Sequence, residues 1–227
     1  MESKKSVYRT EDFSEMEQRF RAQLINSMPG IKALNLVGTR GEDGTENLSV
    51  FNSIFHVGAN PPYLGMVIRP DSVDRHTWQN IQSTGSYTLN SVGEAIYRQA
   101  HQTSARYERG ISEFDAVALD SQYRDGVLAP FVAESAIKIG LELQEFHRVE
   151  CNGTLIVIGK VVYVEIEDAL ITEDGSVDLV KAKSVGSIGV DGYVGVNWLS
   201  RLSYAKPDRE TVTLFPKGST TSCDRIK

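Results

Sequence analysis

Residues 136–166 read AIKIGLELQEFHRVECNGTLIVIGKVVYVEI and predict two long strands, 136–149 and 154–166, joined by a tight turn. Both strands are rich in β-branched residues and mix apolar with polar positions, as the strands of a barrel do. Asn152 and Gly153 in the turn suit the positive φ angles that a hairpin connection requires. The stretch therefore predicts a long antiparallel β-hairpin.

Upstream of this hairpin the chain consists of shorter β-rich runs separated by turn residues. We expect strands at 31–39, 47–58, 63–68 and 87–91, with a charged first turn at 40–46 and a break at Asn60-Pro61-Pro62. Many short strands with few helices favour a closed or split β-barrel over a sheet built from βαβ units. The fold class predicted is mainly β with flanking helices.

Three segments have a helical pattern. Apolar residues recur at helical spacing in 10–24, which we expect to cover an edge or an end of the barrel, and shorter helices are expected at 74–84 and 93–105. The segment 106–114 gives no clear prediction. Residues 184–195 carry a glycine at every third position from Gly186 to Gly195, which predicts a loop.

The chain has 227 residues and no internal repeat or linker, so we expect one domain over 1–227. Within it the barrel core spans about 30–205, the N-terminal helix lies in 1–28, and a polar tail covers 207–227. Two cysteines without a Cys-x-x-Cys pair favour a reducing, cytoplasmic location and argue against a metal site. No apolar run could cross a bilayer, so we expect a soluble protein that contacts no membrane.

A formal charge of −6 makes an extended nucleic-acid surface improbable. The signatures of dinucleotide, NTP, zinc-hydrolase and serine-hydrolase sites are all missing from the sequence. Side-chain catalysis therefore has no obvious nucleophile, and no catalytic side chain is predicted.

A polar stretch within a predicted strand, NLSVFNSIF (47–55), is followed by NPPYLG (60–65) and then by Arg69, Arg75, Thr77 and Asn80. GSYTLN (85–90) comes next, and GKV (159–161) lies further on. In order and spacing these motifs resemble those of the flavin-reductase-like family, over about residues 30–205. The resemblance implies an FMN-binding split β-barrel.

The resemblance also indicates candidate cofactor-binding residues, and their chemistry suits a flavin. A flavin phosphate requires hydroxyls, backbone N–H groups, a helix N-terminus and an arginine. The isoalloxazine ring requires apolar walls with a few donors and acceptors at its pyrimidine edge. The candidates are Ser49, Phe51, Asn52, Ser53, Arg69, Arg75, Thr77 and Asn80.

Each of these residues also has a structural explanation. Asn52 and Ser53 could form the solvent face of a strand, and Thr77 and Asn80 could cap a surface helix. Other weaker candidates are His56 and a basic series that could meet the phosphates of a nicotinamide donor, although such series are more often solvated faces. The series comprises Arg98, His101, Arg106 and Arg109.

The resemblance further implies a homodimer with flavin near the subunit interface, where the partner's residues within 198–204 would complete the site. The activity it implies is an oxidoreductase, an NAD(P)H-dependent flavin reductase that holds FMN, with FAD as the alternative flavin. The reduced flavin would pass electrons to free flavin, to a partner oxygenase or to another acceptor. A non-catalytic flavin carrier or sensor is the second hypothesis. An amine oxidase of the pyridoxamine-phosphate type ranks third.

Overall fold

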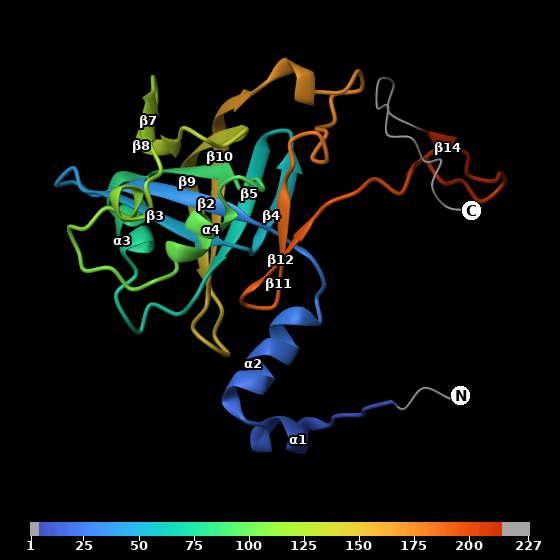
Figure 1. The fold of residues 1–227 in the computed structure, drawn as a ribbon, viewed down its shortest axis with the longest axis horizontal. Coiled ribbons are helices and arrows are strands. Elements are labelled where there is room, and N and C mark those ends of the chain that lie inside the picture. Colours follow the sequence, from blue (N-terminus) through green and yellow to red (C-terminus); the bar gives the residue numbers. More distant parts are fainter. Residues whose placement is uncertain (1–4, 215–227) are drawn as a thin grey trace.

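The computed structural model describes residues 5–214, and its main feature is a seven-stranded antiparallel sheet (Figure 1). The strands are ordered β3-β2-β6-β9-β10-β5-β4. This confirms a mainly β fold with few helices. The seven strands are β2 (Asn35–Arg40), β3 (Glu46–Phe51), β4 (Ile54–Ala59), β5 (Pro62–Ile68), β6 (Ser86–Ser91), β9 (Ile137–Arg148) and β10 (Leu155–Ile166).

The two edge strands of this sheet, β3 and β4, follow each other in the chain with only Asn52 and Ser53 between them. In a flat sheet of seven strands the edges would lie about 29 Å apart. The chain from Phe51 to Ile54 can span only about 11 Å. The sheet therefore curls until its edges meet, and Asn52-Ser53 marks the seam. The single strand expected at 47–58 is wrong in this respect, because a continuous strand could not change edges.

The long hairpin is confirmed. Strand β9 pairs with β10 from Ile137↔Ile166 to Arg148↔Leu155, with two register shifts. Such irregularities bend a strand, which a curled sheet requires. A close approach at Gly159 also shapes the interior, because a Cβ there would lie 2.1 Å from the hydroxyl of the buried Tyr87.

Two hydrophobic clusters fill the body of the protein. One lies inside the barrel and includes Val37, Met66 and Leu141. Helix α3 (His76–Thr84) contributes Trp78 to this cluster, and its ring meets Phe146 edge-on at 4.9 Å between centroids. The second cluster lies beneath the short helices α4 (Tyr97–Gln102) and α5 (Glu113–Val117). The helices expected at 74–84 and 93–105 are therefore present, although each is shorter than predicted.

The glycine-rich segment is not a loop, so that prediction is wrong. It forms β11 (Val185–Ile188) and β12 (Gly192–Gly195), an antiparallel hairpin paired with β1 (Lys32–Ala33). Gly186 leaves room for the side chain of Ile31, since a Cβ would lie 2.4 Å from it. Gly189 takes a φ of +63° in the turn. The regular glycine spacing reflects tight packing and a turn within a hairpin.

The N-terminal region forms two helices rather than one, α1 (Thr10–Glu15) and α2 (Gln18–Ser27), because Met16 between them is extended. Neither helix contains a buried residue. They project from the body instead of covering the barrel (Figure 1). Only the last turns of α2 approach the barrel, where Gln23 donates a hydrogen bond to Asp191 beside β12.

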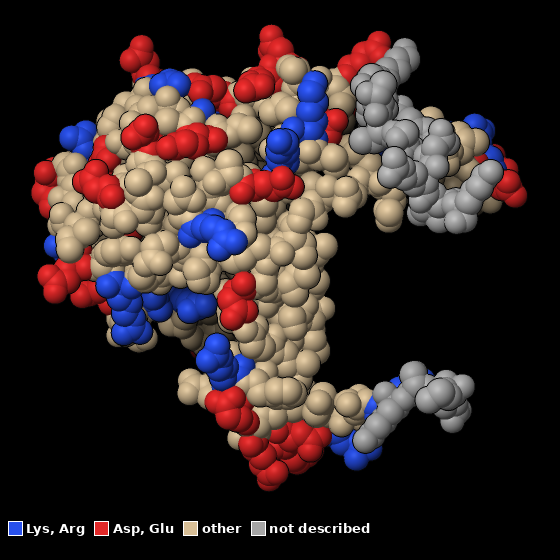
Figure 2. Space-filling view, viewed as in Figure 1, with Lys and Arg blue, Asp and Glu red and all other residues tan. Residues whose placement is uncertain are grey.

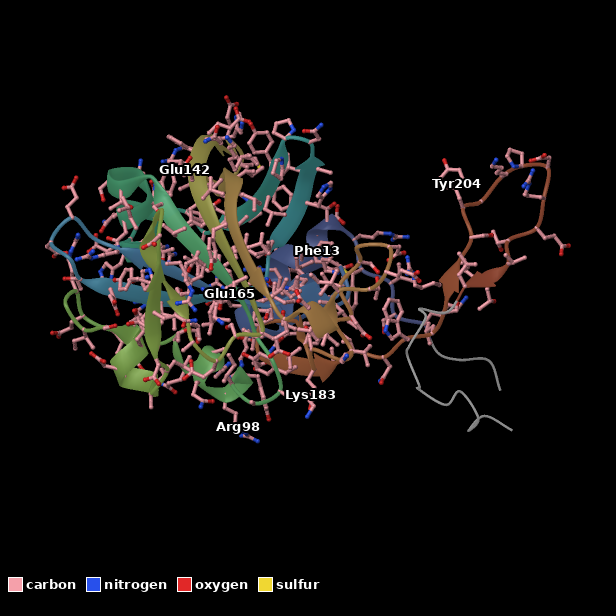
Figure 3. All side chains as sticks on the ribbon, turned by 90° about the horizontal axis from the view of Figure 1, so that it is seen from above. Phe13, Arg98, Glu142, Glu165, Lys183 and Tyr204 are labelled. Atoms are coloured by element: carbon pink, nitrogen blue, oxygen red, sulfur yellow. The ribbon has the colours of Figure 1, made fainter. Side chains whose placement is uncertain are left out.

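Residues after β12 leave the body as an extended arm, defined here as residues 196–214 (Figures 1 and 3). It contains the short strands β13 (Arg201–Leu202) and β14 (Thr213–Leu214), and Tyr204 lies on it far from the barrel (Figure 3). The predicted polar tail, 207–227, lies outside the described residues beyond 214. The remaining elements are the hairpin β7 (Ser121–Arg124) and β8 (Val127–Val132), and a 3₁₀ helix, η1 (Asp168–Leu170).

Candidate functional site

A cavity of about 790 Å³ opens at the seam of the barrel. Its volume lies within the roughly 300–1,000 Å³ usual for small-molecule sites. At the seam β3 pairs only with β2, and β4 pairs only with β5. Apart from the N–H of Leu48, which Glu113 accepts, the backbone groups on these two strand edges can therefore hydrogen-bond a ligand, as edge strands do.

Seven of the eight residues predicted from the sequence line this one cavity. They come from β3, the seam, the end of β5 and the start of α3, all between positions 49 and 77. We call this set the seam wall: Ser49, Phe51, Asn52, Ser53, Arg69, Arg75 and Thr77.

The start of α3 is the part of the seam wall best suited to a phosphate. Arg75 precedes the helix and makes no side-chain cap, so the first N–H groups of α3 have no capping side chain. The Nε of Arg75 donates to the carbonyl of Pro70 at 3.2 Å, which orients the guanidinium. Thr77 Oγ1 accepts a 3.0 Å bond from Asn47 Nδ2, which leaves the hydroxyl proton free to donate. A helix N-terminus beside an arginine attracts an anion.

Asn80 is the predicted residue that does not line the cavity. Its amide donates to Thr39 Oγ1 at 3.2 Å, and the side chain is buried. It instead lines a small neighbouring cavity of about 20 Å³. Asn80 therefore fastens α3 to β2. His56 and residues 198–204 do not line the large cavity either, and the latter lie on the arm.

The basic series separates into two pairs. Arg106 and Arg109 line the cavity, whereas Arg98 and His101 do not. Arg98 lies at the outer surface of the body (Figure 3), above the ring of Tyr97. Among the described residues the cavity lining holds four arginines and three carboxylates. A positive lining in a chain of charge −6 favours an anionic ligand.

Glu113 is a buried carboxylate in this lining that sequence reasoning missed. It is 6% exposed, and its Oε2 accepts the backbone N–H of Leu48 at 2.8 Å. Burial raises the pKa of Glu113 above the ordinary value for glutamate. The carboxylate thereby satisfies a donor of the edge strand β3 and joins α5 to that strand. The segment 106–114 gave no signal for this contact, which depends on tertiary structure.

Other residues that line the cavity lie far from the seam wall in sequence. Ser187, Val190 and Tyr193 come from the β11–β12 hairpin, and residues 103–109 come from the loop after α4. We call this set the hairpin wall. The sequence prediction missed Ser187 and Tyr193 because it assigned their segment to a loop.

A flavin fits these groups. The start of α3 with Arg69 and Arg75 would hold its phosphate, and Phe51, Asn52 and Ser53 at the seam supply an aromatic face and polar groups for its ring. Within residues 5–214 there is no group of three or more metal-ligating His, Cys, Asp or Glu side chains. None of the helices in the described part of the chain is long and apolar enough to span a membrane.

Solved structures of similar fold were found. A split-barrel protein of Shewanella frigidimarina NCIMB 400, provisionally assigned as a flavin reductase, is 44% identical; the match covers 88% of this chain and 100% of that one, with a TM-score of 0.85. Nitrilotriacetate monooxygenase component B of Bacillus cereus is 17% identical over 89% and 100% of the two chains, with a TM-score of 0.77. The 2-nitrobenzoate 2-nitroreductase of Pseudomonas fluorescens is 19% identical over 90% and 99%, with a TM-score of 0.75.

At 17% and 19% identity, the last two structures show that the fold is shared, and the activities in their names are not carried over to this chain. The family model for the flavin reductase like domain matches residues 31–180, which include the strands of the barrel and the whole seam wall. On this match and on the Shewanella structure, the chain belongs to the flavin reductase like family of split-barrel proteins.

Proposed function

We propose that this protein binds FMN in the seam cavity and acts as an NAD(P)H-dependent flavin reductase. The observation that carries the proposal is the meeting of seven predicted residues on one cavity wall, with an uncapped helix N-terminus at one end. FMN is favoured over FAD because this one phosphate-binding end suffices for a mononucleotide. When bound, the flavin would supply the redox chemistry.

The residues of the seam wall would bind and orient the flavin. Arg69, Arg75 and the first N–H groups of α3 would hold the phosphate, with Thr77 as a hydroxyl donor. Asn52 and Ser53 would meet the pyrimidine edge of the ring, because the strands on either side leave their seam edges unpaired. The nicotinamide donor would stack on the ring. Hydride transfer requires close positioning rather than a side-chain acid or base.

We also propose that the protein works as a homodimer with the flavin near the subunit interface. No residue of the arm is buried, and Leu199 and Tyr204 are 91% and 87% exposed. A two-stranded hairpin without a core is not stable by itself. Figure 2 shows an uncharged surface between the arm and the N-terminal helices. A second copy seated there would cover these apolar side chains.

The dimer is tested by the double substitution Leu199→Asp and Tyr204→Asp. We expect a shift from twice the chain mass toward the 25.1 kDa monomer in light scattering after gel filtration. Leu128→Asp is the matched control, because Leu128 is 62% exposed on β8, away from the arm. A wild-type protein that is monomeric at every concentration would contradict the dimer.

The flavin reductase proposal is tested by absorption spectroscopy of the purified protein without oxygen. Added FMN should bind and show a flavin spectrum, and NADH or NADPH should then bleach it. Flavin bands that neither nicotinamide bleaches would indicate a flavin carrier instead. A protein that binds no flavin would refute the proposal.

A further inference from the structure

One residue of the hairpin wall, Tyr193, belongs to a hydrogen-bonded pair that flavin binding does not require. The hydroxyl of Tyr193 on β12 lies 2.6 Å from Nδ1 of His101 on α4, across 92 positions of sequence. The two rings meet edge-on at 5.7 Å between centroids. Tyr97, one turn earlier on α4, packs against the Tyr193 ring at 5.5 Å. Helix α4 therefore fixes the position of the phenol from two sides.

A second hydroxyl reaches the cavity from the same hairpin, on Ser187. Ser187 is directly opposite Tyr193 in the register of β11 and β12. Such residues project from the same face of a hairpin, with Cβ atoms about 4.5–5.5 Å apart. Ser187 is 4% exposed, and its Oγ has no hydrogen-bond partner among the described residues. Because buried hydroxyls are normally paired, this one indicates a ligand atom that bonds to it.

The pair connects the cavity with solvent. Tyr193 lines the cavity, whereas His101 is exposed. Burial, with a smaller contribution from Asp191 in the same hairpin, raises the pKa of the Tyr193 phenol. The phenol therefore keeps its proton at neutral pH, and His101 can pass a replacement proton from water. The nearest other charged group on α4 is Arg98, which lies over the ring of Tyr97.

We propose that the hairpin wall binds a quinone as electron acceptor, and that Tyr193 donates a proton to it while His101 positions and reprotonates Tyr193. This inference rests on the proposed flavin binding and names the acceptor of the same site. Ser187 and Tyr193 present two hydroxyls to the cavity from the same hairpin, which suits the carbonyl oxygens of a quinone. The acceptor must also be planar, because it has to stack against the flavin ring.

The reaction balances with groups already named. When bound and reduced, the flavin would supply a hydride, which carries two electrons, and one carbonyl oxygen of the quinone would accept it. The proton on Tyr193 moves to the other carbonyl oxygen, so the product is a hydroquinone. The resulting phenolate takes a proton from water through His101. With NAD(P)H as reductant, the sum is NAD(P)H, a proton and a quinone giving NAD(P)⁺ and a hydroquinone.

The test compares two acceptors on the flavin-loaded protein. Menadione, a small quinone, takes up a hydride and one further proton, whereas ferricyanide takes single electrons and no proton. We expect Tyr193→Phe to lower the ratio of the menadione rate to the ferricyanide rate at least about tenfold, since general acids contribute about 10²–10⁴-fold. Tyr97→Phe is the matched control and should keep the ratio. His101→Ala should lower it, and His101→Asn, which keeps a hydrogen-bonding side chain at this position, should restore part of the loss.

Three results would overturn the inference: a wild-type protein that reduces ferricyanide but not menadione, a Tyr193→Phe variant with an unchanged ratio, or a Ser187→Ala variant that loses flavin rather than menadione affinity. If neither nicotinamide bleaches the flavin, the reductase proposal fails separately. Reoxidation by menadione of photochemically reduced, protein-bound flavin then tests the hairpin wall without a nicotinamide. A protein that binds no flavin refutes both proposals.

Discussion

The two walls of the cavity differ in how the sequence encodes them. The seam wall comes from one stretch, positions 49–77, and rests on the barrel core through α3. The hairpin wall joins the loop after α4 to a hairpin some 80 residues later in the chain. Residues close in sequence leave a readable motif, whereas a wall assembled from distant segments does not. If the two proposals hold, flavin affinity would reside in the first wall and acceptor chemistry in the second.

The largest effect should come from removing the core support of the seam wall. Trp78 is 2% exposed and packs against Phe146, so Trp78→Ala should lower the free energy of unfolding by about 3–5 kcal/mol. Tyr193→Phe in the hairpin wall should cost about 1 kcal/mol or less, because it removes one half-buried hydrogen bond. Urea unfolding measures both. Equal losses of unfolding free energy in the two variants would contradict this difference between the walls.

Removing the charge at the phosphate end should have the next largest effect. Arg75→Ala should weaken FMN binding by about 2–3 kcal/mol, since hydrogen bonds to charged groups contribute about 1.5–3 kcal/mol. Arg98→Ala is the control, because Arg98 lies outside the cavity. Quenching of flavin fluorescence gives both affinities. If Arg75→Ala binds FMN as the wild type does, the phosphate lies elsewhere.

Thr77 provides a finer test of the same end. Thr77→Ala should weaken FMN binding by about 1–2 kcal/mol through loss of one hydroxyl donor. Thr77→Ser keeps the hydroxyl and should retain most of the affinity. Both variants also report on Asn47, whose amide donates to this hydroxyl. Equal affinities for the alanine and serine variants would remove Thr77 from the phosphate site.

The smallest expected effect concerns Glu113, which joins α5 to β3. Since burial raises its pKa, the folded protein holds this proton at a pH where the unfolded chain has already released it. Its contribution to stability is therefore greatest below the ordinary glutamate pKa of 4.5 and falls as pH rises through the raised folded-state value. Glu113→Gln should remove this fall while still accepting from Leu48, with a change of about 1 kcal/mol or less at pH 7.

Urea unfolding at several pH values, from the ordinary glutamate pKa of 4.5 upward, measures the Glu113 effect. Asp115→Asn is the matched control, because Asp115 is an exposed carboxylate on the same helix. If the free energy of unfolding falls with pH equally in Glu113→Gln and in the wild type, titratable groups other than Glu113 cause the fall.

The sequence by itself determined the strands of the seven-stranded sheet apart from the break at Asn52-Ser53, the long hairpin and most of the seam wall. Alternation, β-branched runs and an Asn-Gly turn are local signals, and NLSVFNSIF (47–55) lies within one segment. These features depend on neighbours along the chain, so they are readable without coordinates. The motif also singled out Asn52 and Ser53, although it did not reveal why they matter.

Only the tertiary structure decided that Asn52-Ser53 is the seam where two sheet edges meet, because that depends on the order of seven strands. The tertiary structure also forms a hairpin from a segment whose glycines predicted a loop. Those glycines leave room for the side chains of Ile31 and Gln23, which are far away in sequence. Asn80, predicted as a cofactor-binding residue, instead donates a hydrogen bond to Thr39, which is also distant in sequence. Contacts between distant segments set these features, and no local pattern encodes them.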